Sequence, residues 1–449
     1  MDYRPISKQN IVIASILALL CLLLPMSPDA RLAMLYGING IACCWGMFSF
    51  KEEPYTLHKV CHIFILMFFV VANAIQYYSG AIATSLKVTF STQDYILFQS
   101  TVLGIIAITN VVYIASRRFL DTKGKDLQPT AAKRSADNGA RVKFSVLLAM
   151  SIFALVATIA YYWNDPRLMF IRHIDGVGER LNNYTRPLYL IFTTLVRALP
   201  FLAYLIARLE GFSRNKRIVL LAIMTITLFP TGLARNAVAI YWLPVIIVNV
   251  PQLKRPHLFV LGMLAALLVV FPLLNQFKHY KGEINFSLST KHFTTLNYDT
   301  SQIFMADQQM DIVTNGKQLL GVALFFVPRA IWPSKPVGSG CYLAKPQGVW
   351  ANISMPYWGE GYINFGYLGV IIFAILLATI MAYMDGRYWK REKHQLFTGN
   401  YLIILALTMF ILRGDLLSSW SRQVAVCLLF SVIYKVLTYK KPFKQEYST

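Results

Sequence analysis

Positively charged side chains recur where this sequence enters or leaves its long apolar segments. Arginine suits a phosphate partner there, because its planar guanidinium group donates two parallel hydrogen bonds and stays charged. A single arginine at such a place can simply reach toward lipid headgroups. Ionisable groups at the edge of an apolar layer are costly, however, so several cations together favour a site for an anionic substrate. The cations concerned are Arg172, Arg180, Arg235, Arg329, Lys335 and Arg413.

Carboxylates are few near these cations, and two of them are candidates for chemistry. Glu360 lies between two glycines, and Asp415 closely follows Arg413 in the chain. Glu360 either forms an ion pair with Arg329 or Arg235, or acts as a general base that takes a proton from a sugar hydroxyl. Asp415 either orients Arg413 or caps the turn after it. Both alternatives stay open on the sequence alone.

Aromatic side chains gather in the long connection that ends at residue 366. Trp332, Tyr357, Trp358 and Tyr362 all lie in it. Trp and Tyr collect at membrane interfaces, and sugar rings also stack on aromatic faces. Because these aromatics lie beside arginines in the sequence, we expect glycan contacts from them.

Motifs for nucleotide, metal or zinc-dependent chemistry are missing from the sequence. It has no Walker A loop, GxGxxG, HExxH or GxSxG pattern. The six cysteines form no CxxC pair and no metal-ligand spacing, and five lie in or beside apolar segments. We therefore predict no cofactor, no metal site and no disulfide framework.

The composition is typical of a multi-pass membrane protein. Hydrophobic residues make up 56% of the 449 residues and charged residues 14%, and the mean hydropathy is +0.50. The net charge of +22 does not indicate a nucleic-acid partner. Most cations fall in connections that an alternating topology places in the cytoplasm, as the positive-inside rule requires.

About twelve apolar segments approach the roughly 18–20 residues that cross about 30 Å of hydrocarbon. They predict an all-α, polytopic membrane bundle with one large periplasmic loop. The expected spans are 10–27, 32–50, 60–78, 95–116, 144–163, 187–208, 218–233, 236–250, 257–274, 367–385, 397–413 and 416–438. The expected regions are helices 1–4 (1–116), a basic cytoplasmic linker (117–143), helices 5–9 (144–274), the periplasmic loop (275–366), and helices 10–12 with the tail (367–449).

Several short stretches carry a likeness to a known family. Residues 232–236 contain a small-residue/Arg motif, and residues 328–336 read Pro-x-x-hydrophobic-Trp-Pro-x-basic-Pro. Arg329 to Gly340 fits an Arg-x10-Gly pattern, residues 356–366 run into the tenth span, and Arg413 lies near the start of the last one. In this order the stretches resemble the Wzy-type O-antigen (oligosaccharide repeat-unit) polymerases of bacterial envelopes. The resemblance covers roughly residues 165–440.

The resemblance implies a GT-C-like glycosyltransferase of the bacterial inner membrane with its site facing the periplasm. The substrate would be an undecaprenyl-diphosphate-linked oligosaccharide, and a chain-length determinant protein is an expected partner. The growing chain would leave its lipid diphosphate and join the non-reducing end of a new unit, without metal or nucleotide. Glu360 is the expected base, with Arg235, Arg329 and Arg413 on the diphosphates. The expected binding residues are Arg172, Arg180, Lys335, Trp332, Tyr357, Trp358, Tyr362 and Asp415.

Three other functions stay open on the sequence. An O-antigen ligase would use the same lipid-linked donor and is expected to carry a histidine in the large loop, where His279 and His292 lie near the start. A flippase or transporter would favour charges near the bilayer midplane and paired halves, and Arg197 is the cation that lies clearly within an expected span. A purely structural envelope protein is the third alternative.

Overall fold

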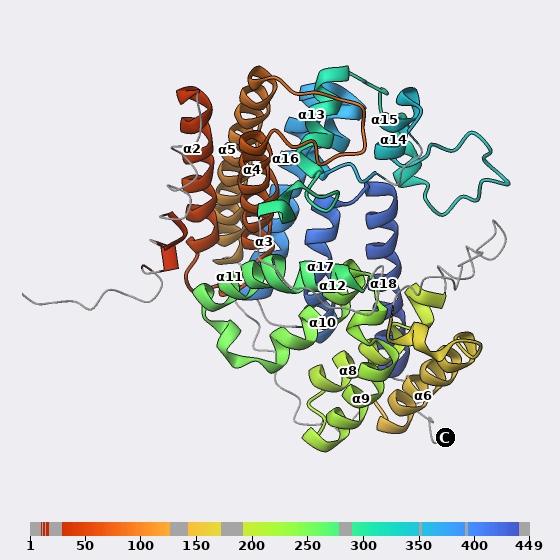
Figure 1. Cartoon of the computed structure of the whole chain (residues 1–449). Helices are drawn as coiled ribbons and strands as arrows, with labels where there is room; N and C mark the ends of the chain where they lie inside the picture. The colour runs from red at the N-terminus through yellow and green to blue at the C-terminus, as the bar shows by residue number, and fades with distance from the viewer. Residues whose placement is uncertain are drawn as a thin grey trace, which may run out of the picture.

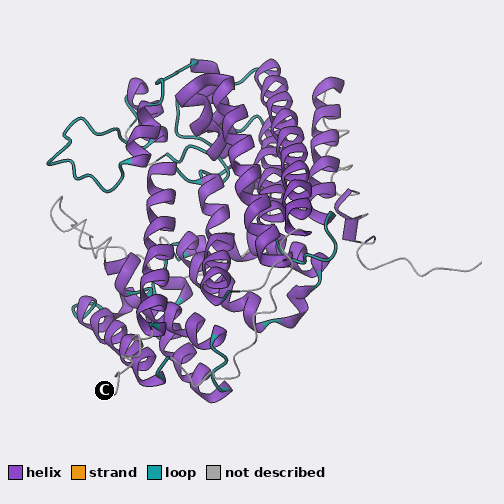
Figure 2. Ribbon diagram, turned by 180° about the vertical axis from the view of Figure 1, so that it is seen from behind, coloured by secondary structure: helices purple, strands orange, loops and turns teal. Residues whose placement is uncertain are grey.

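The computed structural model describes residues 29–125, 142–171, 192–277, 290–349, 353–390 and 394–439, with a few further residues between 10 and 17. Every regular element in these ranges is a helix (Figure 2). The prediction of an all-helical protein is therefore confirmed for the described part of the chain. Arg172, Arg180, His279 and most of the expected span 10–27 lie outside these ranges.

The N-terminal helices form one side of the molecule, where α2, α4 and α5 are neighbours in Figure 1. The elements are α2 (Ala30–Phe48), α3 (Leu57–Phe64), η2 (Ile65–Val71), α4 (Ala72–Ser79) and α5 (Thr92–Lys125). Because α3, η2 and α4 follow one another without a break, they make one apolar helix from Leu57 to Ser79 that is mostly buried. Thr56 begins this helix by accepting a hydrogen bond from the Lys59 amide.

A second group of helices packs at the lower right of Figure 1, with α6, α8 and α9 in mutual contact. Its members are α6 (Phe144–Tyr161), α8 (Leu199–Leu209) and α9 (Arg214–Thr227). The chain then continues through α10 (Arg235–Asn249), α11 (Pro256–Ala265), η7 (Ala266–Val270) and α12 (Phe271–Gln276). Helix α10 packs on α17 and so joins this group to the C-terminal helices.

The C-terminal third combines short helices at one end with three long ones. The short helices are α13 (Thr300–Met310), α14 (Lys317–Ala323) and α15 (Ser339–Ala344), and the long ones are α16 (Tyr357–Lys390), α17 (Gln395–Arg413) and α18 (Leu416–Thr438). Figure 1 shows α13, α14 and α15 together at the upper end. The expected periplasmic loop thus contains several short helices in the part that the structure describes.

Helix α16 is two helices joined at a break. Phe365 and Gly366 have non-helical backbone angles, and Gly366 has φ +60° and ψ −149°, which favours glycine. The two parts touch at Gly361 and Gly369, where a Cβ on Gly369 would lie 1.9 Å from the Gly361 carbonyl oxygen. The first part, which carries Glu360, therefore folds back on the helix that follows it.

Seven helices in the described residues are long and apolar enough to cross a membrane. They are Leu57–Ser79, Thr92–Leu120, Phe144–Tyr161, Pro256–Leu274, Tyr357–Trp389, Gln395–Arg413 and Leu416–Thr438. Each corresponds to an expected span, so the prediction of a multi-pass membrane protein is confirmed, whereas the count of twelve is not shown. Expected spans 187–208, 218–233 and 236–250 contain α8, α9 and α10 of 11, 14 and 15 residues, short of the roughly 20 that a straight crossing needs.

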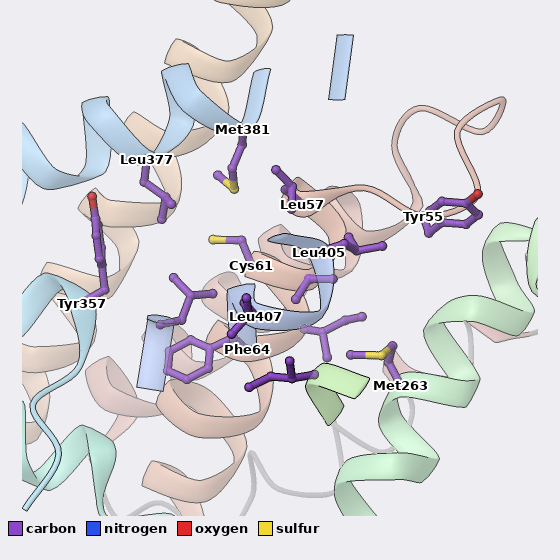
Figure 3. Packing of buried hydrophobic residues seen from close by; sticks show 14 of the residues in the cluster. Tyr55, Leu57, Cys61, Phe64, Met263, Tyr357, Leu377, Met381, Leu405 and Leu407 are labelled. Carbon is purple, nitrogen blue, oxygen red and sulfur yellow. The ribbon is translucent and has the colours of Figure 1, made fainter. Parts of the chain in front are cut away.

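The core lies where α3, α16 and α17 meet. Figure 3 shows Cys61 and Phe64 of α3 among Leu405 of α17 and Leu377 and Met381 of α16, all of them buried. Since lipid is as apolar as these side chains, close packing rather than exclusion from water holds such helices together. This packing fixes the ends of α16 and α17, which carry the candidate site.

Candidate functional site

Arg235 and Arg413 converge on one short segment of chain. Arg235 is the first residue of α10 and Arg413 the last of α17. Arg235 donates a hydrogen bond to the Asn297 side-chain oxygen, and the Arg413 Nε donates to the Asn297 main-chain oxygen at 3.1 Å. Both guanidinium groups also lie over Phe271, at 4.0 Å and 5.9 Å from the ring centroid. We call Arg235 and Arg413 the arginine pair.

The turn before α10 is built to bring Arg235 to this place. Residues Pro230–Gly232 form one 3-10 turn, and Leu233 and Ala234 are extended before the helix begins. A Cβ on Gly232 would lie only 2.0 Å from the Met169 carbonyl oxygen, so this position accepts only glycine without movement. Gly232 of the 232–236 motif therefore has a packing reason that the sequence did not reveal.

In the part of the chain that the structure describes, Asp299 is a carboxylate that lies against the arginine pair. Its Oδ1 is 3.9 Å from an Arg413 terminal nitrogen, which is a long ion pair. Burial raises the pKa of Asp299 to about 7, and the Arg413 charge opposes that rise. Burial, and then the Arg235 charge, lower the pKa of nearby His292. The surroundings thus favour neutral side chains next to the two arginines, and this leaves the pair net positive.

Glu360 is buried and held by two hydrogen bonds. The Ser339 hydroxyl donates to its Oε2 at 2.5 Å, and the Leu416 amide donates to its Oε1 at 2.8 Å. These donors stand at the start of α15 and of α18. Among the ion pairs of the described residues none includes Glu360, so the alternative in which it pairs with Arg329 or Arg235 is not seen.

Asp415 caps α18 and also contacts the start of α15. Its Oδ1 accepts from the Leu417 amide at 3.0 Å, and its Oδ2 accepts from the Gly340 amide at 3.3 Å. Burial raises its pKa, and the backbone amides counteract the rise. Of the two sequence alternatives, capping the turn is therefore the one observed.

One turn of chain joins the two parts of the site. Arg413 and Asp415 flank Gly414, so their Cα atoms are within about 7 Å of each other. Glu360 binds the amide of the next residue, Leu416. The arginine pair and the two carboxylates therefore border the same α17–α18 turn.

Arg329 and Lys335 belong to a different part of the structure. Arg329 donates to the carbonyl oxygens of Lys335 and Pro336 at 2.5 and 2.9 Å. Lys335 donates to the carbonyl oxygens of Phe325 and Val327 at 2.6 and 2.9 Å. Burial and then the Arg329 charge lower the pKa of Lys335. All four of these hydrogen bonds lie within residues 325–336. None of them links Arg329 or Lys335 to the arginine pair.

Three of the four expected glycan-binding aromatics are core residues. Tyr357, Trp358 and Tyr362 are buried. Trp358 lies near Phe64 and Phe69, and the Tyr362 hydroxyl donates to Asp311 at 2.9 Å. Their ring faces are covered by protein because this stretch is the first, inward part of α16 rather than an open loop. Trp332 is half-buried and donates to the Ser334 hydroxyl.

The residues that hold the site together were not among those predicted from the sequence. Asn297, Asp299 and Phe271 contact the arginine pair, and Asn297 is 62 and 116 residues from its two partners. A local sequence motif cannot predict contacts between residues so far apart in the sequence. Asp307 was missed as well: it is fully buried, neither of its carboxyl oxygens has a hydrogen-bond partner among the described residues, and burial raises its pKa, with Glu360 adding to the rise.

The segment of the chain that matches a known family includes this turn. Residues 353–446 match the family model of the O-antigen polysaccharide polymerase Wzy. The Wzy-matching segment contains Glu360, Arg413 and Asp415 and all of α16, α17 and α18. It confirms the family resemblance for the C-terminal part of the chain. No curated protein and no solved structure matches the chain.

Among the described residues, no group of three or more His, Cys, Asp or Glu side chains could hold a metal ion. The charged groups available at the turn are the two guanidinium groups and the buried carboxyls. Such a set can bind an anionic group and accept a proton.

Proposed function

We propose that the chain is a membrane glycosyltransferase that polymerises undecaprenyl-diphosphate-linked oligosaccharide repeat units on the periplasmic face of the bacterial inner membrane. The observation that carries the proposal is the arginine pair at the α17–α18 turn, within or against the Wzy-matching segment. The growing chain would be transferred to the non-reducing end of a new lipid-linked unit, with the lipid diphosphate as the leaving group.

The arginine pair would bind the diphosphate of the donor. As the bond between the anomeric carbon and the diphosphate oxygen breaks, its electron pair moves to that oxygen and negative charge grows there. Fixed cations aimed at that charge stabilise the transition state more than the ground state. Because the contact between Asp299 and Arg413 is long, the diphosphate can replace Asp299 as the partner of Arg413.

Glu360 would act as the base for the acceptor. The acceptor oxygen attacks the anomeric carbon and loses its proton to Glu360, either directly or through the Ser339 hydroxyl, which would take that proton as it passes its own to the carboxylate. Removal of the proton in the transition state makes the oxygen a better nucleophile. No oxidant, reductant or nucleotide is needed, because cleavage of the sugar–diphosphate bond drives the transfer.

The surface glycan of a deletion strain tests the proposal. The strain is complemented with wild type, Arg235→Ala, Arg413→Ala or the control Arg387→Ala. Arg387 is an exposed arginine at the other end of α16, bonded to Tyr383. Loss of a group that stabilises developing charge reduces the rate by about 10²–10³-fold. We therefore expect both site variants to collapse the ladder to core plus one unit, while the control keeps a full ladder.

Each other pattern of bands contradicts the proposal in its own way. If the deletion removes every glycan-capped band, including core plus one unit, the protein is a ligase or a flippase. If the two site variants, present in the membrane at wild-type amount, keep a full ladder, the arginine pair is not the diphosphate site.

A further inference from the structure

The segment 324–338 forms a loop that leaves the body of the molecule sideways. It follows α14 and ends where α15 begins at Ser339. Figures 1 and 2 show it projecting away from the long helices, at the end of the molecule where α18 begins. We call residues 324–338 the lateral loop.

The lateral loop is held in shape by its own cations. Arg329 reaches the carbonyl oxygens of Lys335 and Pro336, and Lys335 reaches those of Phe325 and Val327. These four hydrogen bonds join residues 325–329, where the loop leaves the molecule, to residues 335 and 336, where it returns. The shape therefore exists before any partner binds, and a partner need not supply the free energy to order it.

The outer side of the lateral loop is apolar. Ile331 is 77% exposed and Phe326 is 67% exposed, and Val337 is exposed as well. Trp332 next to Ile331 is half-buried and keeps its indole N–H on Ser334. Large apolar side chains grouped on a pre-shaped loop indicate contact with a further surface.

The base of the lateral loop packs against α14 and the start of α18. Pro336 packs on Gly321 of α14, and the space at Gly338 is set by Asp415, the cap of α18. Helix α18 is one of the seven helices of membrane length, and it exposes Trp420 and Leu428 along its side. The base of the lateral loop therefore lies at the start of a helix that is long and apolar enough to cross a membrane.

We propose that the lateral loop inserts into the lipid headgroup region beside the start of α18. Side chains such as Ile331 and Phe326 would enter the boundary between headgroups and acyl chains, where interfacial segments lie about 5–10 Å deep. The bonds of Arg329 and Lys335 to loop carbonyl oxygens suit this place, because they satisfy backbone acceptors that would otherwise enter an apolar zone. Cations are also favoured near the phosphates of anionic lipids. The inference rests on the loop and its surroundings and is independent of the proposed reaction.

Nitroxide labels in lipid nanodiscs test the insertion. Ile331→Cys and Phe326→Cys are labelled on a background without native cysteines, in nanodiscs of phosphatidylethanolamine and phosphatidylglycerol. Two labelled controls calibrate the scale: Lys317→Cys, exposed at the start of α14, and Leu376→Cys, exposed on the lipid side of α16. The measurement is the collision rate with oxygen, which concentrates in lipid, relative to that with a water-soluble nickel complex.

We expect both loop labels to give an oxygen-to-nickel ratio several-fold above that of Lys317→Cys and below that of Leu376→Cys. A ratio equal to that of Lys317→Cys would show the loop in water and overturn the proposal. Broadening that disappears on dilution with unlabelled protein would assign the loop to a second copy of this chain. A lipid-like ratio that arises only on addition of a polyprenyl diphosphate would assign it to a substrate tail, and either result would also overturn the proposal.

Discussion

Two polar regions lie at opposite ends of the same long helices, and they hold their charges in different ways. Helix α17 carries Tyr401 near its start and Arg413 at its end, about 18 Å apart at 1.5 Å per residue. At the Tyr401 end, Asp385 accepts four hydrogen bonds, from the Leu57 and His58 amides at 2.9 and 3.3 Å and from the Tyr113 and Tyr401 hydroxyls at 3.0 and 2.7 Å. We call these residues the Asp385 cluster.

The Asp385 cluster is closed in the sense that its carboxylate and the neighbouring Arg117 guanidinium are buried and have partners within the fold. Next to it, buried Arg117 forms an ion pair with Glu53, donates to the Tyr113 hydroxyl at 3.3 Å and lies over Phe50. At the other end, the ion pair of Arg413 with Asp299 is long, and the Arg413 side chain is 25% exposed. Removing one member of a buried, internally paired set destabilises the fold, whereas a charge with a loose internal partner is suited to a ligand.

The largest expected effect is the loss of folded protein when Asp385 is replaced by alanine. Asp385→Ala leaves two buried amides and two buried tyrosine hydroxyls without their acceptor, and each lost partner costs about 1–3 kcal/mol. The sum is comparable to the whole stability of about 5–15 kcal/mol of an ordinary protein. We expect little folded protein from this variant, measured as monodisperse protein after detergent extraction.

Glu52→Ala is the matched control for Asp385→Ala, since Glu52 is an exposed carboxylate at the same end of the molecule. It should leave the yield of monodisperse protein unchanged. Normal extraction of Asp385→Ala together with a lost glycan ladder would reverse the comparison, because the closed cluster would then be the functional one.

The next largest effect distinguishes a structural role of Glu360 from a catalytic one. In Glu360→Gln the side-chain oxygen can still accept from the Leu416 amide, and the new amide group can donate to the Ser339 hydroxyl. The fold should therefore persist, while the loss of a general base slows transfer by about 10²–10⁴-fold. We expect wild-type amounts of extracted protein and a ladder reduced to core plus one unit.

Ser339→Ala sharpens the result for Glu360. It removes the hydroxyl that donates to Glu360 but leaves the carboxylate and its bond to Leu416 in place. A smaller loss of ladder than in Glu360→Gln supports the carboxylate as the base. A full ladder in Glu360→Gln would make Glu360 a structural link between α15 and α18, like Asp385 at the other end.

The sequence predicted the helices and the polar sites unequally well. Seven expected spans appear as membrane-length helices because an apolar run of that length has few other stable structures in lipid. Arg235 and Arg413 were found because a cation beside an apolar run stands out. Tyr357, Trp358 and Tyr362 were expected in the large periplasmic loop, because composition does not show that they lie on a helix that ends at the Phe365–Gly366 break and has these rings buried.

The partners of the charges could not be predicted, because they depend on contacts across the fold. Asn297 joins the arginine pair from a segment far away in the sequence, and Asp385 meets Leu57 over a separation of 328 residues. Those distant contacts decide whether a buried carboxylate has a full set of hydrogen-bond partners or only a long ion pair. The distinction between the two regions therefore needed the structure.

The smallest effect concerns Asp299 and depends on pH. Burial raises its pKa from 3.8 to about 7, so it is protonated below pH 7 and ionised above it. As the pH rises from 6 to 8, the carboxylate forms and competes with a bound diphosphate for Arg413. An ion pair of this exposure is worth about 1 kcal/mol, or about fivefold in affinity. The binding of a short-chain polyprenyl-diphosphate sugar to purified protein should therefore weaken by that factor in wild type.

Asp299→Asn should bind the same ligand equally well at pH 6 and pH 8, since the amide does not ionise and the sugar diphosphate diester has no pKa in this range. Stability gives a second check with its own sign. A carboxyl whose folded pKa is raised destabilises the fold increasingly from about pH 4 to about pH 7, so the variant should resist heating better than wild type at pH 8. If wild type shows no weakening of binding between pH 6 and 8, Asp299 is a fixed part of the fold. The partners of the arginine pair would then be supplied by the fold, as those of Asp385 are.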